Sequence, residues 1–150
     1  MKNLYDPTDL EQLEQRIASL RPDSARQWGK MDVAQMVAHC ARSMEWAVGD
    51  RIPKRMFVGG MLGMLIKPLV FRNDEPLRRN SPTAPELVVC EPCELDAERQ
   101  RLLTLIDRFT ASGRPGCTTH PHSFFGRLTP DQWAILMYKH LDHHLRQFAA

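Results

Sequence analysis

Two histidines one helical turn apart, His140 and His144, are the residues of this 150-residue chain whose type and spacing favour chemistry. Side chains at positions i and i+4 of an α-helix share a face, so both imidazoles can reach one divalent metal ion. They belong to a row with Trp133, Met137 and Phe148 that we expect to face inward. Buried imidazoles need partners, and either a metal ion or hydrogen-bonding neighbours can supply them. The pair alone leaves both explanations open.

Three further histidines lie close to this pair in the sequence. His143 points ~60° around the helix from His140, away from the expected inward face. His120 and His122 lie in the loop before the helix, where either can line a pocket or remain a surface residue. Pro121 stiffens the loop next to His120. We therefore name His120 and His143 as candidate pocket residues.

The cysteines offer a weaker candidate site. Cys90 and Cys93 have the CxxC spacing of a redox pair or of half a zinc site. A second CxxC or CxxH is missing from the sequence, and a thioredoxin-like strand-to-helix pattern does not surround the pair. We expect the cysteines to be reduced and without a catalytic role.

Four amphipathic helices must position the histidines. We expect them at about residues 6–20, 32–48, 96–112 and 129–148, with Asp32 and Thr129 as N-caps and Pro130 in the first turn of the last helix. No alternating strands appear, so the fold class is all-α, and a four-helix bundle is the economical arrangement. His39 lies on the flank of the second apolar stripe, and periodicity alone does not select it as a ligand.

The middle of the chain is less regular. Residues 56–71 form the most apolar run, which Lys67, Pro68 and the glycines at positions 59, 60 and 63 interrupt. The run is too short to span a bilayer. We expect a disturbed helical segment after Pro53 that is buried, faces a second copy of the chain, or covers a pocket. A long loop follows, and loops of this length often cover a site.

Composition indicates a single soluble domain over residues 1–150. Hydrophobic residues make up 43% and charged residues 25%, and the formal net charge is only +2. Because no basic stretch is interleaved with aromatic residues, we expect no nucleic-acid partner. The N-terminus lacks a signal-peptide core, so we expect a cytoplasmic protein with no membrane partner. A homodimer through the apolar run is a further expectation.

These features together resemble a known family. The segments 30–40 (KMDVAQMVAHC), 80–87 (NSPTAPEL), 120–129 (HPHSFFGRLT) and 138–148 (YKHLDHHLRQF) are similar to the DinB/YfiT-like superfamily of metal-binding four-helix bundles, and to a DinB-like subfamily of unknown function. The resemblance covers nearly the whole chain. It implies an up-down-down-up bundle with a long crossover between helices 2 and 3.

The resemblance also implies a metal site. Its ligands are three histidines, which match His39, His140 and His144. Many members place Arg-Gly-Gln directly after the last ligand, whereas here Leu145 intervenes, so His143 competes with His144; the helical face favours His144. Zinc and nickel both suit imidazole ligands.

The function that the resemblance implies is a metal-dependent enzyme. It would use a low-molecular-weight thiol as a small-molecule substrate in S-transfer or a related reaction. The alternative is a non-enzymatic metal-binding or dimerising bundle related to stress.

Overall fold

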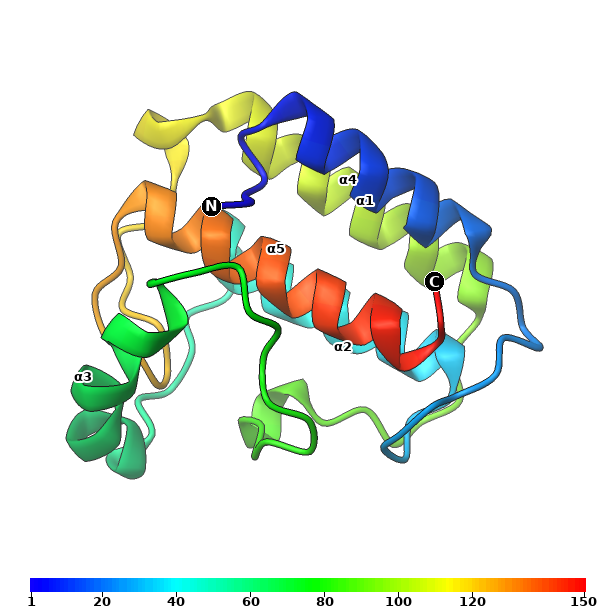
Figure 1. Cartoon of the computed structure of the whole chain (residues 1–150), viewed down its shortest axis with the longest axis horizontal. Coiled ribbons are helices and arrows are strands. Elements are labelled where there is room, and N and C mark those ends of the chain that lie inside the picture. The colour runs from blue at the N-terminus through cyan, green and yellow to red at the C-terminus, as the bar shows by residue number, and fades with distance from the viewer.

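Five α-helices and two short 3₁₀ segments make up the regular structure in this computed structural model (Figure 1). The structure describes the backbone of residues 1–150 and the side chains at every position except 58, 60 and 61. The elements in order are α1 (Pro7–Ser19), α2 (Val33–Val48), α3 (Phe57–Val70), η1 (Pro85–Leu87), α4 (Leu95–Ser112), η2 (Arg114–Gly116) and α5 (Pro130–Gln147). The predicted all-α class is confirmed.

The two helices that carry the candidate ligands begin at capping boxes. The Asp32 side chain accepts from the Gln35 backbone N–H at the start of α2, and Thr129 accepts from Gln132 in the same way at the start of α5. α2 ends at Gly49, whose φ of 84° is readily adopted only by glycine. Local sequence therefore sets the ends of both helices close to where the sequence predicts them.

Four of the helices build the core. α2 packs against α4 and α5, and α1 packs against the same two helices. In Figure 1, α1 runs beside α4, and α5 runs beside α2. Their facing sides bury apolar residues that include Leu13, Val37, Met44, Phe109 and Trp133. The apolar stripes of the sequence predict these contacting faces, but the helix count is five, not four.

The fifth helix is α3, which forms from the glycine-interrupted apolar run and stands apart from the other helices in Figure 1. A Cβ at Gly59 would lie 2.7 Å from the Phe124 Cα, and one at Gly63 would collide with the Phe124 carbonyl oxygen. The glycines thus let α3 lie directly on the loop before α5. Gly60 lies outside the described side-chain positions. Among the described residues, no helix has both the length and the apolar character to cross a membrane.

The long connection between α2 and α4, predicted as a crossover, crosses α5 on its way. The ammonium of Lys139, a buried residue of α5, donates to the carbonyl oxygens of Val70 (2.8 Å), Asn73 (2.5 Å) and Glu75 (3.1 Å). Three carbonyls satisfy the three ammonium donors. The connection is thereby held against α5 next to His140.

Candidate metal centre

Three histidines converge between α2 and α5. His39 comes from α2, and His140 and His144 come from successive turns of α5. Their ligand nitrogens all lie within 4.8 Å of one another, and the two Nε2 atoms of His39 and His140 are 3.0 Å apart. His39 and His144 are only 3% and 9% exposed. The structure therefore brings together the three residues that the family resemblance implies, and they could hold a metal ion.

The carbonyl partner of His39 determines its tautomer, whereas the hydroxyl partner of His140 allows two arrangements. His39 Nδ1 lies 2.8 Å from the Leu87 carbonyl oxygen, which can only accept, so Nδ1 carries the proton. His140 Nδ1 lies 3.0 Å from Ser43 Oγ, which in turn lies 2.8 Å from the Cys40 carbonyl oxygen. With the hydroxyl proton on the Cys40 carbonyl, Ser43 Oγ accepts from His140 Nδ1, and His140 Nε2 carries a lone pair. With the hydroxyl turned toward His140 Nδ1, His140 Nε2–H instead donates to His39 Nε2 at 3.0 Å.

The third ring is held by Gln147 in the same tautomer as His39. His144 Nδ1 lies 2.9 Å from Gln147 Oε1, and Gln147 Nε2 donates to the Trp28 carbonyl at 2.7 Å. The contact with Trp28 sets the orientation of the amide, so that its oxygen faces the imidazole. His144 Nδ1 therefore donates, and the Nε2 atom of this ring also carries a lone pair.

The 3.0 Å between His39 Nε2 and His140 Nε2 therefore accommodates either a hydrogen bond from a protonated His140 Nε2 or a cation between two lone pairs. An extra proton as that cation is disfavoured, since burial lowers the pKa of His39, holds that of His140 well below its usual value and lowers that of His144 to about 3. Tetrahedral zinc–nitrogen bonds of about 2.0–2.1 Å place neighbouring ligand nitrogens roughly 3.3 Å apart, close to the 3.0 Å between His39 and His140 Nε2. Ligand atoms as far apart as 4.8 Å must move closer to share one ion. The donor set thus fits a divalent metal.

The two candidate pocket residues lie outside this cluster. His143 Nδ1 donates to the Leu77 carbonyl at 3.1 Å, and its ring contacts the Trp28 ring edge-on. His143 therefore holds the crossing loop against α5. His120 is exposed, and its backbone N–H donates to Thr118 Oγ1 at 3.2 Å.

His122, not His120, is the loop histidine that packs inward. Its ring contacts the rings of Trp46 and Trp133, and its Nδ1 accepts from the backbone N–H of Phe124 at 3.1 Å. Burial, together with the nearby Arg55 charge, lowers its pKa to about 4. The sequence favoured His120 because Pro121 stiffens the loop, but a stiff loop does not determine which side chain faces inward.

Sequence reasoning missed the residues that orient the ligands. Ser43 follows His39 by four residues, and Gln147 follows His144 by three. Both spacings place a polar side chain beside an imidazole on one helix face, a signal that could have found them. The Leu87 carbonyl carries no such signal, because a backbone oxygen 48 residues away depends on the path of the loop.

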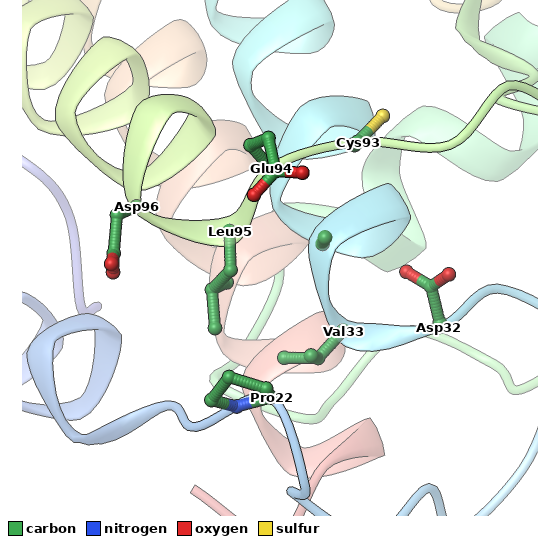
Figure 2. Close-up of a pocket in the computed structure, with 8 residues that line it drawn as sticks. Pro22, Asp32, Val33, Cys93, Glu94, Leu95 and Asp96 are labelled. Carbon is green, nitrogen blue, oxygen red and sulfur yellow. The ribbon is translucent and has the colours of Figure 1, made fainter.

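The CxxC pair lies at a different place. Cys93 lines a surface hollow of about 320 Å³ at the starts of α2 and α4, with the carboxylates of Asp32, Glu94 and Asp96 spread around it (Figure 2). All four cysteines are free. Burial and neighbouring carboxylates raise the pKa of Cys93, which reduces the thiolate that redox chemistry needs.

Comparison with known proteins identifies the family of this chain but assigns no activity to it. No curated protein and no solved structure matches the chain. A family model described as "Protein of unknown function (DUF1569)" matches residues 2–150. The chain therefore belongs to the DUF1569 family of proteins of unknown function.

Proposed function

We propose that this protein binds a divalent metal ion through the Nε2 atoms of His39, His140 and His144. The observation that supports this is that Nδ1 of each ring lies against a polar partner, which leaves Nε2 of each ring as the atom available to a metal ion. Second-shell partners of this kind orient metal-binding histidines and raise their basicity. Three imidazoles that converge from two helices, two of them buried, are costly to bury unless their nitrogens have partners, and a metal ion supplies one partner for all three.

We further propose that the site is catalytic and uses a low-molecular-weight thiol. Three histidines are the protein ligands of a catalytic type of zinc site, which keeps a position for water or substrate. A bound zinc or nickel ion would supply Lewis acidity and lower the pKa of a coordinated water or thiol. Because the three imidazoles are neutral, they leave the charge of a divalent ion uncompensated, which favours an anionic ligand such as a thiolate. The resemblance to the DinB/YfiT-like superfamily points to the same chemistry.

A specific observation favours a second function, non-enzymatic metal binding. His39 and His144 are deeply buried, and the cluster found among the described residues contains no carboxylate that could act as a general base. In this case a fourth ligand would close the site, and the metal would stabilise the fold.

Metal content tests the site itself. We expect about one zinc or nickel ion per chain in the untagged protein by plasma mass spectrometry, and loss of the ion in His39→Ala, His140→Ala and His144→Ala. His120→Ala is the matched control, because its side chain is exposed and lies outside the cluster. Absence of metal from the wild type after reconstitution would refute the proposal.

Cobalt substitution separates the two functions. Thiols such as glutathione or cysteine should produce a thiolate-to-cobalt charge-transfer band if the site has an open position. That result would justify assays of thiol transfer to chlorodinitrobenzene. A cobalt spectrum unchanged by any thiol would refute the thiol-dependent enzyme and leave the non-enzymatic metal protein.

A further inference from the structure

The outer face of α3 is an exposed apolar feature that the histidine cluster does not explain. Phe57, Met64 and Leu65 are 86%, 74% and 71% exposed, and Leu69 is 56% exposed. At 100° per residue these four side chains fall on one side of the helix, opposite Gly59 and Gly63, which lie on the Phe124 loop. Monomeric soluble proteins seldom expose a contiguous apolar face of this kind unless something binds it.

The charges within α3 and the segments directly next to it, residues 51–72, have one sign. Residues 51–72 contain five basic residues and no acidic residue, although the whole chain is nearly balanced at 20 basic to 18 acidic. The basic residues lie before the helix, in its last turn and after it: Arg51, Lys54, Arg55, Lys67 and Arg72. On the N-terminal side, Asp50 is paired with Arg108, and Arg51 is paired with Glu45 at 2.9 Å. On the C-terminal side, the exposed Asp74 and Glu75 follow Arg72. The unpaired excess of positive charge is therefore greatest at the start of α3, at Lys54 and Arg55, with Lys67 in the last turn.

We propose that α3 binds the surface of an anionic lipid bilayer, with its axis in the membrane plane. The outer face would enter the boundary between headgroups and acyl chains, and the flanking lysines and arginines would contact lipid phosphates and carboxylates. A helix of 14 residues is about 21 Å long, short of the ~30 Å hydrocarbon core. The expectation of no membrane partner rested on the missing signal-peptide core and on an apolar run too short to span, and binding in the membrane plane requires neither.

Hydrogen bonds and close packing hold α3 against the loop before α5. The Met56 backbone N–H donates to the Ser123 carbonyl at 3.0 Å, and Arg55 donates to the His122 carbonyl at 2.7 Å. The glycine face is already used for packing on the same loop. Only the outer face of the helix is therefore offered to a partner.

Charge argues for a lipid surface over a second copy of the chain. A two-fold pairing of α3 with itself would bring the same basic residues to both rims of the interface, where like charges repel. An anionic bilayer offers the opposite charge, and each basic residue near such a surface strengthens binding by roughly fivefold.

Vesicle flotation tests the proposal with the full-length protein. We expect it to float with vesicles of phosphatidylcholine and phosphatidylserine at low salt, and to bind vesicles of phosphatidylcholine alone at least about tenfold more weakly. The double variant Phe57→Ser/Leu65→Ser should lose binding, whereas Val88→Ser, which removes an exposed valine elsewhere, should not. Lys54→Gln/Arg72→Gln should weaken binding by on the order of tenfold, and Lys30→Gln should leave it unchanged.

Two outcomes would overturn the proposal. Wild-type protein that stays unbound to anionic vesicles, or a serine double variant that is folded by circular dichroism and still floats, would show that α3 is not the anchor. If the wild type is instead a dimer by sedimentation and the serine variant is a monomer, with neither binding vesicles, the face is an interface between copies. None of these readouts depends on the metal site.

Discussion

Replacement of Gln147 by leucine is the most direct test of how the three histidines are held. Gln147 is 3% exposed, and its side chain is bonded to His144 at one end and to the Trp28 carbonyl at the other. Leucine is similar in size and makes neither bond. The substitution therefore strips the acceptor from His144 Nδ1 while leaving all three candidate ligands in place.

Two separate losses follow from these contacts. Without an acceptor at Nδ1, His144 can place its proton on Nε2, which blocks that nitrogen as a ligand. Loss of such an outer-shell partner typically weakens metal binding by about 10–100-fold, or about 1.4–2.7 kcal/mol. The metal-free protein should also lose about 1–2 kcal/mol of unfolding free energy, because the buried His144 ring loses its partner at Nδ1 and the half-buried Trp28 carbonyl loses its donor.

Competition with a chromophoric chelator measures the first loss, and urea unfolding of the metal-free protein measures the second. Gln100→Leu is the control, since Gln100 is an exposed residue of α4. Zinc affinity within about twofold of wild type in Gln147→Leu, together with a clear loss of stability, would refute the orienting role of Gln147 and with it the tautomer argument for His144.

Three further predictions concern residues outside the cluster. The pKa of His122 is lowered to about 4, so between about pH 6.5 and pH 4 the unfolded chain takes up a proton that the folded chain does not. The unfolding free energy should therefore fall by up to about 3 kcal/mol on acidification through this window. His122→Asn should remove that part of the pH dependence in urea unfolding, while its oxygen still accepts from Phe124; an unchanged slope would show that His122 titrates normally. Gly63→Ala should destabilise the protein by about 1–3 kcal/mol in thermal unfolding, because the new methyl meets the Phe124 carbonyl, whereas the exposed substitution Leu65→Ala should have little effect. Cys90→Ser/Cys93→Ser should keep the full metal content, and loss of metal would instead assign the ion to the cysteines.

Local sequence determined the helices that carry the site. Asp32 and Thr129 cap α2 and α5 with their own side chains, and such bonds need only residues three positions away. The spacing of His140 and His144 likewise follows from the pitch of one helix. These features are encoded within single segments, so a pattern in the sequence is enough to predict them.

Tertiary structure decided the contacts between residues of different segments. His39 is on the flank of its apolar stripe, and only the packing of α2 against α5 brings its Nε2 to 3.0 Å from that of His140. The carbonyl of Leu87 becomes its partner because the long connection crosses the cluster at that residue. The apolar run at residues 56–71 is equally consistent with a buried segment, a lid or an exposed helix. Its exposure follows from where Gly59 and Gly63 meet the Phe124 loop, and hydrophobicity along one chain does not encode a contact between distant backbones.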